Sequence, residues 1–207
     1  MNKFIMEANQ FLDRDVVGYF HTDFYGVSHP RNPNFLYKFK NDPHHNWTQQ
    51  HLRYAINDLN RVLRMDFPEI MRHVKLDSLT VCVVPRAKAD NFYRPDQLLF
   101  RTTVGEYAQS TLGFQDGSGF IVRHTNTRTT HLRKLNEGFE NDGQMPYPGI
   151  ASDTCHFSQK ISGHDILLVD DIYTKTVNID EDMVQALFDN GARSVVFYAI
   201  GNTPRKF

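Results

Sequence analysis

The strongest constraint on the fold is a block near the C-terminal end in which two apolar strands flank a helix. Residues 165–171 (DILLVDD) form an apolar run that ends in two acids, and residues 194–200 (SVVFYAI) form a second apolar run. Between them, residues 179–190 carry apolar side chains at helical spacing. A strand, a helix and a strand in this order make a βαβ unit, whose crossover makes the strands parallel. The sequence therefore predicts an α/β fold with a central, mainly parallel sheet flanked by helices.

Residues suited to helix ends delimit the helix of this block. Asn178 is suited to the N-cap, and Glu181 stands three positions later, where the partner of a capping box belongs. Gly191 stands where a left-handed residue commonly ends a helix. The loop over residues 172–178 thus connects the carboxyl end of one strand to the N-terminus of a helix.

Weaker patterns predict the other elements of the chain. An apolar stripe predicts a helix over residues 47–64, and we expect Pro68 to mark its end. The connection over residues 124–160 shows little periodicity, and a connection of this length is usually a functional lid or partly mobile. The remaining predicted elements are a buried strand over residues 79–84, a helix over residues 95–112 and a strand over residues 119–123.

The N-terminal part of the chain differs from the rest. Residues 1–45 are rich in aromatic and turn residues, and their prolines forbid a long helix. Short strands or an irregular cap fit this composition better. We therefore expect residues 1–75 to form an aromatic-rich extension or hood that packs on an α/β core of residues 76–207.

The overall composition argues against several classes of protein. The chain has 207 residues, with 23 Lys and Arg and 24 Asp and Glu, so its formal net charge is −1. This balance argues against a protein that coats nucleic acid by charge alone, although a local basic patch stays open. No apolar run reaches the ~18–20 residues that a membrane span needs. The 2 cysteines are too few for a disulfide framework, so a reduced pair in the cytoplasm is the expectation.

Cysteine and histidine give no pattern typical of a metal centre. Cys82 falls in a predicted strand and reads as a small buried hydrophobic residue. The close group of histidines is His44, His45 and His51, and neither a cysteine nor a carboxylate completes a four-ligand set beside it. We therefore assign no metal ligand directly.

The strongest chemical signal lies where the strand 165–171 ends. In open parallel sheets, ligands bind beyond the carboxyl ends of the strands. Asp170 and Asp171 fall at that place, and two adjacent carboxylates can accept hydrogen bonds from a diol. The helix N-terminus that follows supplies free N–H groups and a positive dipole end, which favour an anion. This local chemistry indicates a ligand with a hydroxyl-rich sugar and a phosphate.

These residues also resemble a known motif. The stretch ILLVDDIYTKTVN (residues 166–178) resembles the phosphoribosyl-pyrophosphate (PRPP) motif of type I phosphoribosyltransferases. In that motif an apolar strand is followed by two acids, two apolar residues and a loop of Ser or Thr and Gly. The resemblance is closest to the ComF-like and amidophosphoribosyltransferase-like branch. It is loose over residues 76–203 and specific over residues 163–203, where GARSVVFYAIGNT also resembles the family's following strand.

The resemblance implies roles for the matching residues. It implies that Asp170 and Asp171 bind the ribose hydroxyls and that Arg86 acts on the leaving pyrophosphate; these three are the candidate catalytic residues. It also implies Mg²⁺, which would bridge the pyrophosphate oxygens while water fills other positions. The candidate substrate-binding residues are Thr174, Lys175, Thr176, Val177 and Asn178 in the phosphate loop, Lys88 in the pyrophosphate loop, and Arg123 and Arg128 in or beside a mobile catalytic loop.

One position departs from the family pattern and leaves two hypotheses open. Thr176 stands where the family has glycine, which permits a closer backbone approach and a positive φ. The first hypothesis is a glycosyltransferase of the phosphoribosyltransferase class, which transfers a ribosyl phosphate to an unknown nucleophile and releases pyrophosphate. The second is a non-catalytic or altered-activity effector or regulatory module of the same fold, for example an accessory component of a bacterial, retron-type defence system.

The expected partners follow from these hypotheses. Both predict a phosphorylated ribose ligand such as PRPP. The aromatic N-terminal region leaves a homodimer or a protein partner open. For the basic run over residues 123–133, the near-neutral charge of the chain favours a lid over a nucleic-acid contact.

Overall fold

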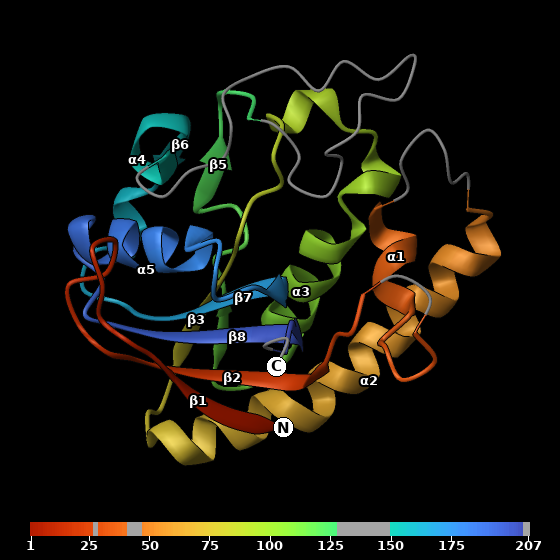
Figure 1. Ribbon diagram of the computed structural model, residues 1–207, viewed down its shortest axis with the longest axis horizontal. Helices are drawn as coiled ribbons and strands as arrows, with labels where there is room; N and C mark the ends of the chain where they lie inside the picture. The colour runs from red at the N-terminus through yellow and green to blue at the C-terminus, as the bar shows by residue number, and fades with distance from the viewer. Residues whose placement is uncertain (27–28, 41–46, 128–149, 205–207) are drawn as a thin grey trace.

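A mainly parallel sheet forms the centre of the molecule. Figure 1 shows the computed structural model of the chain. The structure describes residues 1–26, 29–40, 47–127 and 150–204. Six strands form the sheet in the order β1-β2-β8-β7-β3-β4. Only the pair β1–β2 is antiparallel among these neighbours. The strands are β1 (Asn2–Met6), β2 (Val16–Asp23), β3 (Leu79–Val83), β4 (Phe114–Asp116), β7 (Asp165–Tyr173) and β8 (Ser194–Asn202). The predicted α/β class with a mainly parallel sheet is confirmed.

The predicted βαβ block forms as β7, α5 (Ile179–Asp189) and β8. In the sheet, Leu167 of β7 pairs with Val196 of β8 on one side and with Val81 of β3 on the other. Strand β7 therefore occupies the middle of the parallel part, and its residues 165–169 are all buried. A strand covered on both faces needs the continuous apolar run that the sequence carries.

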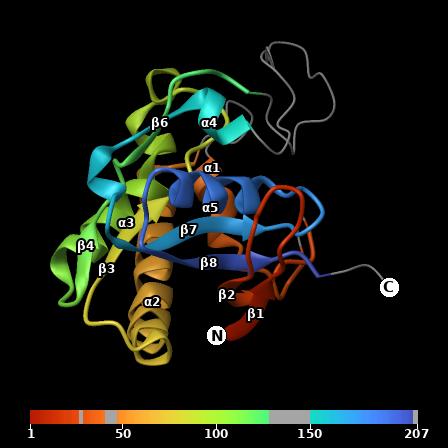
Figure 2. The ribbon, with the colours of Figure 1, turned by 90° about the vertical axis from the view of Figure 1, so that its left-hand side faces the viewer.

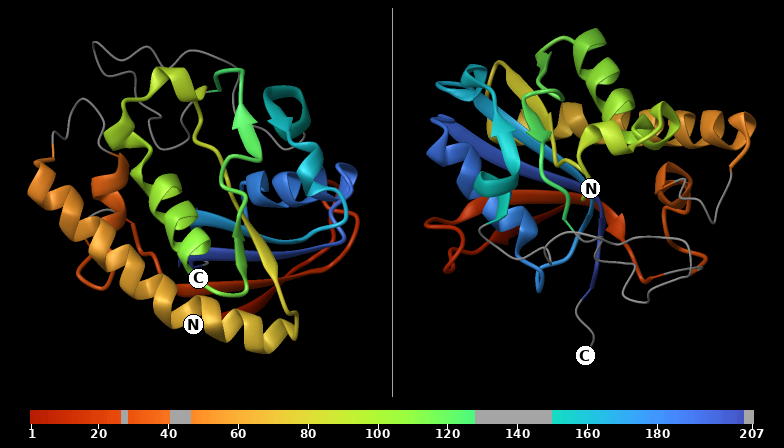
Figure 3. Two further views of the ribbon diagram at one scale, coloured as in Figure 1. Left: turned by 180° about the vertical axis from the view of Figure 1, so that it is seen from behind. Right: turned by 90° about the horizontal axis from the view of Figure 1, so that it is seen from above.

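Helices cover both faces of the sheet, as the further views of the ribbon show (Figures 2 and 3). The longest is α2 (Gln49–Val74), which lies beside α3 (Leu99–Ser110) and the short α1 (Phe35–Lys40) on one face. Helices α5 and α4 (Ile150–Thr154) lie on the other. Because side chains alternate along a strand, Leu167 and Val169 pack toward α2, whereas Ile166 and Leu168 pack toward α5.

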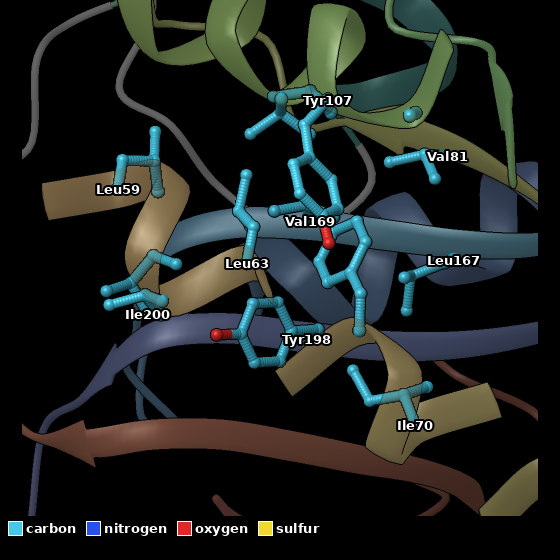
Figure 4. Close-up of a cluster of buried hydrophobic side chains, with 14 of the residues drawn as sticks. Leu59, Leu63, Ile70, Val81, Tyr107, Leu167, Val169, Tyr198 and Ile200 are labelled. Carbon is cyan, nitrogen blue, oxygen red and sulfur yellow. The ribbon is translucent and has the colours of Figure 1, made fainter. Parts of the chain in front are cut away.

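The core on the α2 side is shown in Figure 4. Leu59, Leu63 and Ile70 of α2 are fully buried against the sheet, where Tyr198 is also fully buried. The hydroxyl of Tyr198 donates to the buried carboxylate of Asp66 at 2.7 Å. Nδ1 of His21 contacts the same carboxylate at 2.9 Å, so Tyr198 and His21 together provide partners for a buried acid.

The predicted helix end at Pro68 is wrong, and two short strands lie in places for which the sequence carries no signal. Helix α2 continues past Pro68, because Phe67 and Ile70 beside it are fully buried, whereas Pro68 itself faces solvent. The strand predicted over residues 119–123 forms as β5 (Ile121–Arg123), but it pairs with β6 (Cys155–Phe157) outside the main sheet. The main sheet instead gains β4, which has only three residues and therefore carries no periodic signal.

The N-terminal region contributes directly to the sheet. Strand β2 pairs in parallel with β8, and β1 then pairs with β2 at the sheet edge. Short strands were expected here, but their place beside β8 has no local signal in the sequence. Residues on both sides of position 75 contribute strands to one sheet. The division of the chain into an N-terminal extension and an α/β core at that position stays a prediction.

Among the helices that the structure describes, none is long and apolar enough to cross a membrane.

Candidate functional site

The parallel strands bring several chain segments to one edge of the sheet. Strands β2, β8, β7 and β3 are mutually parallel neighbours, so their carboxyl ends meet at the same edge. The N–H of Val84, just after β3, donates to the carbonyl of Val169 at 2.9 Å, which places the loop after β3 beside the end of β7. This edge is where open parallel sheets bind ligands, and it carries both loops that the sequence singled out.

Asp170 and Asp171 lie near the end of β7 and face opposite sides of the sheet. Both are half-buried, and the N–H of Asp171 donates to Oδ1 of Asp170 at 2.7 Å. Alternation along the strand directs Asp170 toward α5 and Asp171 toward α1. There the ammonium of Lys40, the last residue of α1, forms an ion pair with Asp171. Lys40 is separated from Asp171 by 131 positions, and the sequence carries no signal that joins them.

The segment after β7 forms a tight turn before α5. The N–H of Val177 donates to the carbonyl of Thr174 at 3.0 Å, and the hydroxyl of Thr174 contacts that of Thr203 at 3.0 Å. Thr176 is exposed in this turn, while Asn178 adopts the left-handed conformation with φ 55°. Asparagine tolerates that conformation better than most residues do. The positive φ for which glycine is favoured therefore falls at Asn178 and not at Thr176.

The turn is docked against the segment that follows β1. The ammonium of Lys175 lies 2.5 Å from the carboxylate of Glu7, and Oδ1 of Asn178 accepts from Nδ2 of Asn9 at 3.3 Å. Asn178 holds the N-cap position, but its side chain makes no capping hydrogen bond. The predicted capping box with Glu181 is therefore wrong, because both side chains are committed to other partners.

Three consecutive acids open α5 and point into the protein. Asp180, Glu181 and Asp182 expose only 5, 2 and 8 % of their surface. The hydroxyl of Tyr173 donates to Glu181 at 2.7 Å, and the N–H of Ala151 donates to Asp182 at 2.8 Å. Acids in a first helical turn usually suggest solvated side chains that complement the helix dipole. The structure instead shows these three acids as a buried polar layer.

The carboxyl groups of Asp180 in α5 and Asp170 in β7 influence each other's ionisation. Burial raises the pKa of Asp170 to about 7, the neighbouring charge of Asp171 adds to the rise, and Lys40 opposes it. Burial also raises the pKa of Asp180 well above its usual range, and the charge of Asp170 adds to that rise. Raised carboxyl pKa values beside a strand end are typical of functional sites, although ion-pair networks produce them as well.

Arg86, in the loop after β3, is bound by backbone carbonyls. Its guanidinium donates to the carbonyls of Phe39 at 3.3 Å, Lys40 at 3.1 Å and Gln97 at 2.6 Å. The same group lies over the ring of Tyr93, 4.4 Å from its centroid. Arg86 thus joins the loop after β3 to the end of α1, and so it holds the backbone of the residue that pairs with Asp171.

The other predicted basic residues belong to the same framework. Arg123 is 5 % exposed; its guanidinium donates to the carbonyl of Arg86 at 2.7 Å and to the hydroxyl of Thr154 at 2.6 Å. Lys88 is 6 % exposed, and its backbone N–H donates to the hydroxyl oxygen of Tyr93 at 2.9 Å. Arg128 lies outside the described residues. The structure thus brings Arg86, Lys88 and Arg123 together around one loop.

Neither cysteine has the surroundings of a nucleophile. Burial raises the pKa of Cys82 to about 12, and it raises the pKa of Cys155 as well. Both thiols are free and buried, which agrees with the interpretation of Cys82 as a packed hydrophobic residue. Within the described ranges, no group of three His, Cys, Asp or Glu side chains is arranged to hold a metal ion.

Comparison with protein-family models finds no match for this chain, and comparison with curated proteins finds no significant similarity. The structure and the local chemistry are therefore the basis for assigning a function.

Proposed function

We propose that this chain is a phosphoribosyltransferase-like protein that binds PRPP or a related ribose phosphate where β7 leads into α5. The observation that carries the proposal is the pair Asp170 and Asp171 at the ligand-binding edge of a parallel sheet. A turn and the N-terminus of an 11-residue helix follow the pair directly. The sequence resemblance assigns the sugar to the acids and the phosphate to the turn, and this arrangement supports that assignment.

The charges around the turn are compatible with an anionic ligand. The three acids at the start of α5, Asp180, Glu181 and Asp182, are buried. Because the pKa values of Asp180 and Glu181 are raised, these two side chains carry less negative charge than two fully ionised carboxylates would. Lys175 offers a cation at the turn, and its pair with Glu7 is 40 and 68 % exposed. An exposed ion pair contributes only about 0–1 kcal/mol, so a ligand phosphate can compete for Lys175 at little cost.

The proposed reaction transfers the ribosyl phosphate to a nucleophile. The bond between C1 of the ribose and the pyrophosphate oxygen breaks, the nucleophile bonds to C1, and pyrophosphate leaves with the electron pair. Mg²⁺, which the resemblance implies, would be held by pyrophosphate and water, where it supplies positive charge to the leaving group. The chain's own residues would hold the sugar through Asp171 and Asp170 and the phosphate through the turn.

A second candidate function is a binding or effector module without turnover, for example in a defence system. It is favoured by the bonding of Arg86, whose guanidinium is held by three backbone carbonyls and a tyrosine ring. A leaving-group clamp needs donors aimed at the developing charge. The three hydrogen bonds use three of the five N–H groups of the guanidinium, so Arg86 has fewer donors left for a leaving group.

The two candidates are separated by calorimetry with PRPP and Mg²⁺, followed by a pyrophosphate-release assay with nucleobases and with ammonia as acceptors. For either candidate, Asp171→Ala should weaken PRPP binding by about 10- to 100-fold, the value of a hydrogen bond to a charged group. Lys175→Ala should also weaken it. The matched controls are Asp77→Ala and Lys3→Ala, whose exposed side chains lie away from this edge.

Release of pyrophosphate with any acceptor supports the enzyme, and tight binding without release supports the module. If the wild type does not bind PRPP, or if Asp171→Ala binds it as tightly as the controls do, the proposed sugar-phosphate site is wrong.

A further inference from the structure

The longest helix carries a row of arginines on its solvent side. Helix α2 buries its apolar side chains against the sheet, and its other side is exposed. Four exposed arginines lie on that side: Arg53, Arg61, Arg64 and Arg72. Because an α-helix has about 3.6 residues per turn and rises about 1.5 Å per residue, these four fall within about 100° of the circumference and extend over about 29 Å. We call this surface the α2 arginine row.

The acids of α2 offset little of this charge. Asp66 is buried on the opposite side of the helix, where it contacts Tyr198. Asp58 lies 3.1 Å from Arg61, in an ion pair whose side chains are 38 and 73 % exposed. An exposed pair of this kind contributes little stability, so Arg61 can turn to another anion. Glu69, the remaining acid of α2, falls outside the row on the helix circumference. The row therefore keeps a net positive charge.

Uncharged polar groups and an aromatic ring lie among the arginines. Two adjoining open hollows on the surface of α2 share Asn57; Arg53 and Tyr54 line one of them, and Arg61 and Arg64 line the other. A third hollow continues from Arg64 to the end of α3. Tyr54 is 53 % exposed, so its ring is accessible from solvent. The row thus offers cations, an amide and a ring face to an extended ligand.

This chemistry fits nucleic acid better than a lipid surface. The guanidinium group matches the geometry of phosphate, with which it forms two parallel hydrogen bonds. Cations that follow a backbone, together with aromatic rings on which bases stack, are the combination that binds single strands. A helix that binds a lipid surface needs a broad exposed apolar face. Among the residues of α2, however, only Tyr54 and Met65 are large, apolar and exposed.

We propose that the α2 arginine row binds a single-stranded nucleic acid, with the arginines on its phosphates and the ring of Tyr54 stacked on a base. The formal net charge of −1 does not oppose this binding, because salt screens charges beyond about 8 Å in physiological solution. Helix α2 covers the face of the sheet opposite to α5. The row is therefore separate from the proposed sugar-phosphate site, and the proposal stands independently of it.

The salt dependence of binding tests the contacts with phosphate. Fluorescence anisotropy with a labelled DNA strand of about 20 nucleotides should give, for four phosphate contacts, a slope of log affinity against log salt of about −2.8. The strand should then bind about 50-fold more weakly at 200 mM than at 50 mM NaCl. The double variant Arg53→Gln/Arg64→Gln should reduce the slope to about −1.4. The matched control is Arg14→Gln/Lys160→Gln, which removes two exposed cations on the α5 side and should keep the wild-type slope.

A second variant tests the stacking of a base. Tyr54→Ala should weaken binding of the strand about tenfold at every salt concentration, because stacking releases no ions and leaves the slope unchanged. The bases of a duplex are already stacked on one another, so the same variant should bind a duplex of equal length as tightly as the wild type does. All these side chains are exposed, and circular dichroism should show that each variant is folded.

Several results would overturn the proposal. In the wild type, these are the absence of binding at 50 mM NaCl or a slope shallower than −1, and neither depends on any variant. In the variants, they are a slope that Arg53→Gln/Arg64→Gln changes no more than the control does, or a Tyr54→Ala protein that binds the strand as tightly as the wild type. Tighter binding to phosphatidylserine vesicles than to the strand would also overturn it, because the row would then be a lipid-binding surface.

Discussion

Arg86→Ala gives the sharpest test of whether Arg86 acts on a ligand or holds the protein together. The substitution removes three hydrogen bonds to the carbonyls of Phe39, Lys40 and Gln97 and the contact with the ring of Tyr93. A net contribution of about 1 kcal/mol for each hydrogen bond and a similar one for the ring contact sum to about 4 kcal/mol. In a chain of this size, 1 kcal/mol corresponds to a change in Tm of about 2–4 °C. We therefore expect Tm to fall by about 8–16 °C.

The assay is thermal unfolding of purified protein, followed by circular dichroism. Arg53→Ala is the matched control, since Arg53 is exposed on α2 and its replacement should leave Tm within about 2 °C. Arg86→Lys keeps the charge but loses the planar fork, so its Tm should lie between those of wild type and Arg86→Ala. If Tm of Arg86→Ala falls by less than 2 °C while pyrophosphate release is lost, the framework role is wrong and Arg86 is a leaving-group clamp.

Further predictions concern buried groups elsewhere. Burial raises the pKa of Cys82 to about 12, so a disulfide exchange reagent at pH 8 should label this thiol only after unfolding. Arg193 lowers the pKa of Asp165, so their pair stabilises the fold above the ordinary carboxyl pKa and stops doing so as the pH falls through the lowered value. Arg193→Ala should therefore lower Tm more at pH 6 than at pH 2.5, and the effect should be small because Arg193 is exposed. Tyr198→Phe removes one of two contacts of the buried Asp66 carboxylate, the other being with Nδ1 of His21 at 2.9 Å, and should cost about 1.5–3 kcal/mol in urea unfolding.

The sequence predicted well those elements whose own residues determine them. The run from Asp165 is apolar without alternation because β7 is covered on both faces, so the pattern itself indicated a buried parallel strand. β4 was missed because its three residues carry no period, and the helix end at Pro68 was wrong because long-range burial outweighed one lost hydrogen bond. Local sequence patterns thus gave no prediction or a wrong one where contacts with a distant segment of the chain stabilise the element.

The same reasoning separates the parts of the candidate site. Asp170 and Asp171 could be found because a strand end and a helix start are readable from local patterns. Lys40 could not be found, since nothing near it in sequence reveals that α1 ends against Asp171. The burial of Asp180 could not be predicted, because the direction of a first-turn acid depends on what packs above it.

Lys40 also connects the N-terminal region to the ionisation of the site. Its positive charge lowers the pKa of Asp170, against burial and against Asp171, which raise it. Lys40→Met removes that charge and keeps most of the aliphatic length, so the pKa of Asp170 should rise further above its ordinary value. The pH midpoint of PRPP affinity should then move upward, with binding weaker at pH 7 and recovered near pH 9. Lys3→Met, on the exposed side of β1, should leave the midpoint unchanged. A midpoint that stays in place or moves downward in Lys40→Met means that α1 does not control the charge of Asp170.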